Sequence, residues 1–428
     1  MSGKEMKGGL QKMFGAAKPK EKPEIEPIDD PESKPEEVSE TMPDDKSALK
    51  THFTDPQAHQ ASDEESGKDE ALPARHEASH KIAEERLRID VNSEFVEITN
   101  IRLFGIDELD LNSLTSCTTL SLRKNLIHEL SSLPLHLANR LQCLDLFDNK
   151  IKKLRDFFVS ATVPNTEADD ATLIKQPFPQ PFSAITKVDL SYNQFKKIKG
   201  LDSLGPTLKE LYFVENKIKV IEGLDNLVNL EVLELGGNQI RDIGNGLDHL
   251  VNLKQLWLGK NKIANLGTSF HKLKSLEMLS LQANRITKID PETFQEGHHP
   301  SLKELYLSEN GIEVIENLPI HSLKTLDFSF NPIKNINAET VNVENLPDLE
   351  EFWLTDGKID SWDEVQKLAP FSRTMQTVYL ERNPIEQDKR YRDKIYMYLP
   401  FLVQIDSWPI VNKDNVEADR SIQRKNPI

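Results

Sequence analysis

The chain is poor in cysteine and has no long apolar run. Only Cys117 and Cys143 occur in 428 residues, too few for a disulfide framework or a metal-ligand cluster. No stretch approaches the ~18 consecutive apolar residues of a membrane-spanning helix, and no Asn-x-Ser/Thr acceptor is present. The basic start, MSGKEMKGGLQKMFGAAKPK, lacks the apolar core of a signal peptide. We therefore expect a reduced compartment, cytosol or nucleus, and no membrane contact.

The sequence also lacks the motifs of enzyme chemistry. It contains no Walker loop, HExxH, CxxC or Ser-centred elbow. The eleven histidines are scattered, apart from His298 and His299 in EGHHPS. We expect no catalytic residue, no cofactor and no metal, hence a protein that is not an enzyme.

Basic residues are outnumbered by acidic ones, and the formal net charge is -17. This balance argues against binding to a nucleic-acid backbone and suits a basic protein partner. About half of the charge lies in residues 1–80, which hold 11 basic and 19 acidic side chains. That segment is rich in Pro, Glu, Asp and Ser and poor in apolar residues, so we expect a disordered acidic tail.

From about residue 95 the chain repeats the pattern apolar-x-apolar-x-x-Asn-x-apolar-x-x-apolar, mostly in steps of 21 to 26 residues. The asparagine falls at 125, 149, 193, 216, 238, 261, 284, 310, 331 and 383, and Gly357 fills the same slot in one further copy. This period and signature are typical of leucine-rich repeats. We expect an α/β solenoid of eleven to twelve short repeats, with a curved parallel sheet on its concave face and a continuous leucine core. Each asparagine should bond the backbone of its turn and of the next repeat.

The repeats should carry an insertion and two caps. The step from Asn149 to Asn193 is twice the period, so residues 155–186 are expected to loop off the solenoid. Tyr391, Ile395 and Leu399 recur at helical spacing in a C-terminal cap. The predicted organisation is therefore a tail over 1–80, an N-terminal cap region over 81–116, repeats over 117–387, and a C-terminal cap and tail over 388–428.

One position of each repeat carries the functional signal. The residue between the two leading apolar residues of a strand should point out of the core, onto the concave face. These residues are Ser121, Asp145, Asp189, Tyr212, Glu234, Trp257, Ser280, Tyr306, Asp327, Trp353 and Tyr379. Five aromatic rings would then stand in water among carboxylates, and exposed aromatics ringed by charge are typical of protein-binding surfaces. We expect this face to bind a protein.

Several strings match a known family more closely than a repeat consensus would. EEFWLTDGKIDSW, LYLSENGIEVIE and VYLERNPIEQDKRYRDKIYMYLPFLVQID resemble the leucine-rich-repeat regulatory subunit of protein phosphatase 1, of the nuclear suppressor-of-dis2 type. The resemblance covers roughly residues 95 to 408. It implies a non-catalytic subunit whose concave face binds the phosphatase catalytic subunit, alone or in a ternary complex with inhibitor-3. It also implies a nuclear and cytoplasmic location, a role in mitotic chromosome segregation, and control of phosphatase activity or maturation.

The resemblance also implies contact residues. Matched by repeat and slot, they are Asp189, Tyr212, Glu234, Trp257, Glu351, Trp353 and Tyr379, to which the strand pattern itself adds Tyr306. We find no short basic-Val-x-Phe docking motif, so binding should use the folded repeats of a chain that is monomeric on its own. The alternative is a repeat scaffold for another partner, such as a splicing protein with an RNA-recognition motif or a ciliary motor chain. Those scaffolds usually have about half as many repeats.

Overall fold

The computed structural model describes residues 90–164, 171–175, 182–295, 297 and 299–410. The chain divides into two units, Met1–Glu70 and Ala71–Ile428, and every described residue belongs to the second. The predicted acidic tail over 1–80 lies outside the described residues, as does the segment after residue 410.

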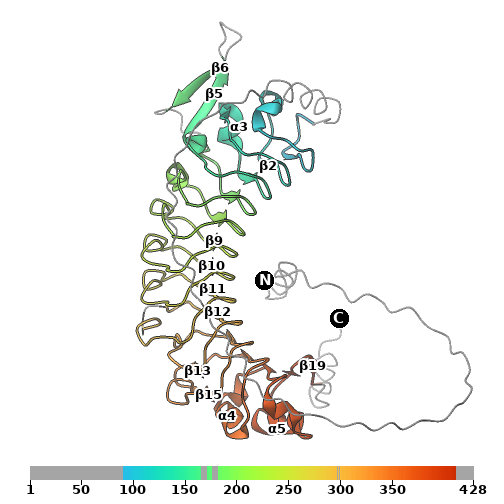
Figure 1. Ribbon diagram of the computed structural model, residues 1–428, viewed down its shortest axis with the longest axis vertical. Helices are drawn as coiled ribbons and strands as arrows, with labels where there is room; N and C mark the ends of the chain where they lie inside the picture. The colour runs from blue at the N-terminus through green and yellow to red at the C-terminus, as the bar shows by residue number, and fades with distance from the viewer. Residues whose placement is uncertain (1–89, 165–170, 176–181, 296, 298, 411–428) are drawn as a thin grey trace, which may run out of the picture. The chain divides into compact units, whose positions relative to one another are not determined.

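Short strands, one per repeat, form the main sheet of the described residues. Its fourteen strands follow the order β1-β2-β4-β7-β8-β9-β10-β11-β12-β14-β16-β17-β18-β19, and only β18 and β19 pair antiparallel. Their bounds are β1 Phe95–Glu97, β2 Thr119–Ser121, β4 Cys143–Asp145, β7 Lys187–Asp189, β8 Glu210–Tyr212, β9 Val232–Glu234, β10 Gln255–Trp257, β11 Met278–Ser280, β12 Glu304–Tyr306, β14 Thr325–Asp327, β16 Glu351–Trp353, β17 Thr377–Tyr379, β18 Gln404–Ile405 and β19 Trp408–Pro409. The coils stack along a curve, with strands β9 to β12 toward its inner side (Figure 1).

The leucines of successive repeats form one continuous core. The residues on either side of each outward position, such as Leu305 and Leu307 around Tyr306, are fully buried. Cys117 occupies a leucine slot and is also fully buried. Because each coil can cover its apolar face only with the coils beside it, the core extends along the whole stack. The predicted leucine-rich-repeat solenoid is confirmed.

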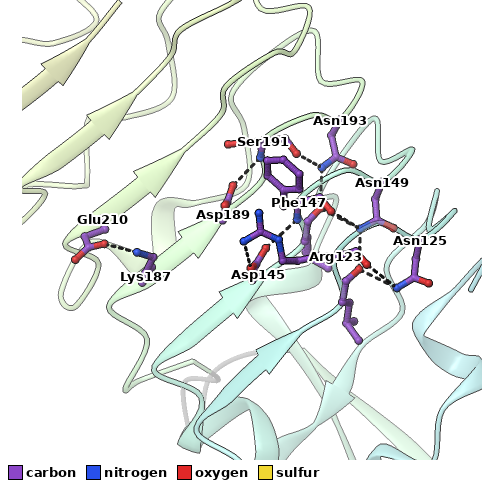
Figure 2. Close-up of polar contacts among 12 residues, drawn as sticks. Arg123, Asn125, Asp145, Phe147, Asn149, Lys187, Asp189, Ser191, Asn193 and Glu210 are labelled. Carbon is purple, nitrogen blue, oxygen red and sulfur yellow. Dashed lines mark hydrogen bonds and ion pairs between the residues drawn. The ribbon is translucent and has the colours of Figure 1, made fainter. Parts of the chain in front are cut away.

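The repeat asparagines form a hydrogen-bonded ladder, but it runs opposite to the predicted direction. The Asn216 amide nitrogen donates to Phe213 O in its own turn (3.2 Å) and to Leu190 O in the preceding repeat (3.0 Å). Its carbonyl oxygen accepts from Phe195 N–H, also in the preceding repeat (3.0 Å). The same pattern recurs at the other asparagines, including the three labelled in Figure 2. Each side chain therefore pairs buried backbone groups of the preceding repeat, not the next.

The predicted insertion is more ordered than a loop. Strands β5 (Ser160–Pro164) and β6 (Ala171–Lys175) form an antiparallel hairpin, and β5 pairs with β3 (Leu133–Pro134), which precedes helix α3 (Leu135–Arg140). The hairpin stands out from the stack (Figure 1). Its flanks do not, since the buried rings of Phe157, Phe158 and Phe182 lie 4.9 to 5.3 Å apart, centroid to centroid. These phenylalanines extend the core between two widely spaced repeats.

Both ends of the repeat core are covered. Strand β1 adds an imperfect repeat beside β2. At the other end, helix α5 (Tyr391–Tyr398) buries Tyr391 and Ile395, followed by the buried Leu399, as the helical spacing predicts. Helix α4 (Trp362–Gln366) packs beside it, and the Trp362 indole N–H donates to Asp388 (3.0 Å). Two further strands, β13 (Val314–Ile315) and β15 (Asn335–Ile336), form a separate parallel pair.

Candidate functional site: the concave face of the repeat sheet

The outward-pointing residues of the strands form one continuous row across the sheet. In the strand register Asp145 pairs with Asp189, Asp189 with Tyr212, and Tyr212 with Glu234. The pairing continues through Trp257, Ser280, Tyr306, Asp327, Trp353 and Tyr379. We call this set, from Ser121 to Tyr379, the concave row. Adjacent members stand on strands about 4.8 Å apart, so their side chains are in contact range.

The C-terminal part of the concave row is an aromatic cluster. The Trp353 and Tyr379 rings meet edge to face with centroids 5.6 Å apart, and the Tyr306 and Trp353 centroids lie 6.2 Å apart. The Tyr306 hydroxyl donates to Glu304 (2.7 Å), and the Tyr379 hydroxyl accepts from Gln404 (2.5 Å). Within the described residues the buried indole N–H of Trp353 has no hydrogen-bond acceptor. An unpaired buried donor costs free energy, so a hydrogen-bond acceptor brought to the Trp353 indole N–H would stabilise this part of the row.

The N-terminal part of the concave row is acidic, and one lysine lies beside it. Lys187 Nζ lies 2.8 Å from Glu210 Oε2 and 4.8 Å from the centroid of the Tyr212 ring. The Tyr212 hydroxyl donates to the same Glu210 oxygen (2.9 Å). Burial alone would lower the pKa of Lys187 and raise that of Glu210, but the ion pair reverses both shifts. Both side chains are therefore charged at neutral pH. Figure 2 shows the ion pair between them.

Glu234 is a buried carboxylate of the concave row that lacks a compensating partner. It is only 8% exposed and stands between Tyr212 and Trp257 in the register. No hydrogen bond or ion pair reaches its carboxylate from the described residues. Burial, and then the charge of Asp189, raise its pKa to about 7, against a small opposing effect of Lys187. A cation brought to this point by a partner would stabilise the charged form.

The comparisons with known proteins agree with this geometry. Family models described as leucine-rich repeats match residues 206–249, 251–312 and 300–427. This chain is a leucine-rich-repeat protein. The repeat unit that the models describe is the one whose outward position forms the concave row.

Relatives of this leucine-rich-repeat protein are regulatory subunits of protein phosphatase 1. It is 32% identical over 153 residues, 35% of this chain and 40% of the relative, to the "Protein phosphatase 1 regulatory inhibitor subunit PPP1R7 homolog" of Arabidopsis thaliana. It is 43% identical over 49 residues (11% and 13%) to the human "Protein phosphatase 1 regulatory subunit 7". It is 36% identical over 111 residues (26% and 27%) to the Saccharomyces cerevisiae "Protein phosphatase 1 regulatory subunit SDS22". The chain therefore spans less than half the length of each relative.

The structure places seven of the eight predicted contact residues in the concave row. These are Asp189, Tyr212, Glu234, Trp257, Tyr306, Trp353 and Tyr379. The eighth, Glu351, starts strand β16 on the same outward side, two residues before Trp353. The charge of Glu351 contributes to raising the pKa of Tyr306, after burial and Glu304. All eight thus lie on one face, although the acidic and aromatic groups occupy different parts of it.

The expectation that five rings stand in water is wrong. Tyr306 is only 7% exposed, and Tyr212, Trp257, Trp353 and Tyr379 are half-buried. The rings lose exposure because strand neighbours and outward residues two positions earlier pack against them, as Glu304 and Glu210 do. The face is a packed layer whose ring edges reach the surface.

Two basic residues of this face were missed by the sequence analysis. Lys187 stands two positions before Asp189, so its side chain has the same outward parity. Arg123 stands two positions after Ser121, and its guanidinium bonds Asp145 (3.0 Å) above the Phe147 ring (4.1 Å to the centroid). Both residues could have been found from the sequence, because residues two positions before or after the outward slot point to the same face as the slot itself. The face is therefore not free of positive charge.

The described part of the chain contains no group of three or more His, Cys, Asp or Glu side chains placed to hold a metal ion. None of the described helices is long and apolar enough to cross a membrane.

Proposed function

We propose that this protein is a non-catalytic regulatory subunit that binds the catalytic subunit of protein phosphatase 1 through the concave row. The observation that carries the proposal is the continuous register of carboxylates and packed rings from Asp189 to Tyr379, in a relative of phosphatase regulatory subunits. A row spanning so many strands matches the footprint of a globular domain better than that of a small ligand.

The two parts of the concave row suggest different roles in binding. Trp353 and Tyr379 have half-buried rings whose positions are fixed by each other, so little side-chain entropy is lost when a partner covers them. They are the natural anchors. Asp189 and Glu234 offer poorly compensated negative charge to basic groups of the partner, which speeds association and fixes orientation.

The finer parts of the proposal concern cellular role. We propose that the protein controls the activity, maturation or nuclear localisation of the phosphatase and acts in mitotic chromosome segregation. It would occupy the nucleus and also the cytoplasm, be monomeric on its own, and admit inhibitor-3 as a third component. The support for these points is the family resemblance.

The test is direct binding of the purified full chain to the purified phosphatase catalytic subunit, measured by calorimetry. A stable one-to-one complex that a short basic-Val-x-Phe docking peptide does not displace supports the proposal. Displacement by that peptide would show docking through a linear motif instead of the folded face. No binding, together with capture of an RNA-recognition-motif protein or a motor chain from lysate, would favour a scaffold for another partner.

A further inference from the structure

A second row of side chains follows the turn edge of the same sheet. The residue directly before the asparagine slot has a left-handed backbone in every repeat, with φ between 51° and 67°. We call these residues the turn row: Lys124, Asp148, Tyr192, Glu215, Gly237, Lys260, Ala283, Glu309, Phe330, Asp356 and Arg382. Left-handed backbone is unfavourable for bulky side chains. Large aromatics at these positions therefore need a reason.

Two members of the turn row are aromatic, and both have carboxylates on either side. Tyr192 lies between Asp148 and Glu215 on the neighbouring repeats, and Phe330 lies between Glu309 and Asp356. Both rings are well exposed, at 47% for Tyr192 and 44% for Phe330. The acid–aromatic–acid arrangement thus occurs twice along one edge, outside the concave row.

At Phe330 an arginine of the same chain occupies the acid–aromatic–acid arrangement. The Arg382 guanidinium lies over the Phe330 ring, 5.4 Å from its centroid, and forms an ion pair with Asp356. Near the other triplet, Arg123 combines the Phe147 ring with the Asp145 carboxylate in the same manner. A planar guanidinium suits such sites because it can stack on a ring while it bonds a carboxylate edge.

At Tyr192 the ring and the two carboxylates are also present. Among the described residues the one cation paired with them is Lys150, whose Nζ lies 3.8 Å from Asp148 Oδ1 and which leaves Glu215 without a partner. The ring packs on Phe147, with centroids 4.8 Å apart. The strand register places Asp148 and Glu215 on the repeats on either side of Tyr192. Burial, followed by the charges of Glu215 and Asp148, raises the pKa of the Tyr192 hydroxyl. Among the described residues no lysine or arginine lies over this ring. The position therefore has the acceptors of the Phe330 site without its arginine.

We propose that Tyr192, with Asp148 and Glu215, is a docking site for an arginine side chain of a partner protein, whose guanidinium stacks on the ring between the two carboxylates. The occupant is argued from charge complementarity and from the way in which Phe330 holds Arg382. Lysine would fit less well, because its ammonium is a compact, strongly hydrated charge without a planar face. The site does not depend on the proposed phosphatase binding, since any arginine-bearing segment following this edge could use it.

The experiment uses the full chain and a fluorescein-labelled tetra-arginine peptide, with binding followed by fluorescence anisotropy at low salt. Tyr192→Ala should weaken binding about fivefold, the size of a well-placed cation–π contact. Alanine is tolerated there, since Ala283 occupies the same slot with the same backbone. Because this change leaves the protein's charge unchanged, general attraction to an acidic surface cannot produce the loss. A tetra-lysine peptide should bind more weakly and respond little to Tyr192→Ala.

Matched variants on the same edge complete the test. Phe330→Ala should leave peptide binding unchanged because its site already holds Arg382, and Arg382→Ala should raise binding about twofold by opening it. Glu215→Gln should weaken binding more than Glu313→Gln, which removes an exposed charge elsewhere. Equal binding by wild type and a folded Tyr192→Ala variant, or equal losses for Glu215→Gln and Glu313→Gln, would overturn the proposal. Phosphatase affinity, measured on the same variants, reports separately on the concave row.

Discussion

Tyr306 and Trp353 contact each other across an intervening strand. Their ring centroids lie 6.2 Å apart, although they belong to β12 and β16 and strand β14 runs between them. The residue of β14 at this level is Asp327, which is 8% exposed. The rings therefore lean together beside a buried carboxylate, whose Oδ1 accepts a hydrogen bond from the Ser329 backbone N–H (2.8 Å). The same residues therefore belong to the packed layer of the fold and to the proposed binding surface.

Replacing Tyr306 with Ala should therefore destabilise the fold as well as alter the surface. The side chain is 7% exposed, so its removal leaves a cavity beside Trp353 and admits water to Asp327. We expect a loss of about 3 kcal/mol in the free energy of unfolding, as for buried aromatics. Urea unfolding gives this value, with the half-buried Tyr379→Ala as the matched comparison. An equal or smaller loss for Tyr306→Ala would contradict the packing described above.

Asn216→Ala should be strongly destabilising without touching either surface. The substitution leaves Leu190 O, Phe213 O and Phe195 N–H without their side-chain partner in the core. Unpaired buried polar groups cost about 1 to 3 kcal/mol each, so for three groups we expect a total loss of at least about 3 kcal/mol by urea unfolding. The control is Asn252→Ala, whose bond to Val228 O is exposed. If Asn216→Ala and Asn252→Ala lower the free energy of unfolding equally, the asparagine ladder does not stabilise the core as described.

The pH dependence of stability should contain a contribution from Glu234. Its folded pKa is raised to about 7, above the ordinary glutamate value of 4.5, so the folded state binds this proton more tightly. Between these values the folded chain carries more protons than the unfolded chain, and stability from this group falls as pH rises. The full contribution is at most about 3 kcal/mol. Glu234→Gln should therefore flatten the stability curve between about pH 4.5 and 7.

The control for the Glu234 experiment is Glu304→Gln on the same face, which removes the negative charge that accepts from the Tyr306 hydroxyl but keeps an amide oxygen as acceptor. Unfolding free energies of the three proteins are compared at pH 5 and pH 8. If the gain of Glu234→Gln relative to wild type is the same at both pH values, the carboxylate titrates normally and the description of its surroundings is wrong. Phosphatase binding that brings a cation to Glu234 should also release protons near pH 7.

Removal of residues 388 to 428 should expose the end of the repeat core. The segment contributes Ile395, Leu399 and Ile405, which are all buried, and the Asp388 carboxylate that Trp362 bonds. Solenoid ends without a cap lose cooperativity and aggregate. We expect broader thermal unfolding and concentration-dependent light scattering. A truncated protein that stays soluble and melts in one sharp transition would show that helix α5 is dispensable.

The sequence allowed the repeat geometry to be predicted because it is periodic. A two-residue alternation places Asp189, Tyr212 and Glu234 on one face, and the strand register confirms this geometry. Local parity does not show how far side chains lean along the sheet. For that reason the burial of Tyr306 and the contact over Asp327 were not anticipated.

Contacts outside the outward slot were also missed. Lys187 and Glu210 form an ion pair between register partners two residues before that slot, and Phe182 packs into the core from beyond the hairpin. The repeat fixes the position of Lys187 and Glu210 but not their charges, and Phe182 lies outside the repeat pattern altogether. The asparagine ladder was predicted, but its direction depends on the offset between coils and not on the sequence of one coil.

The binding affinity of the Trp353→Ala, Tyr379→Ala double variant for the phosphatase catalytic subunit tests the central claim most directly. The two rings touch each other and are only half-buried, so their loss should cost the fold less than loss of Tyr306. As interface anchors each should contribute about 2 kcal/mol, and the double change should weaken binding by a factor of about a thousand. Lys219→Ala, an exposed change off the concave row, is the control. By calorimetry, we predict this loss in a variant that still melts cooperatively. Unchanged affinity in that folded variant would contradict binding through the concave row.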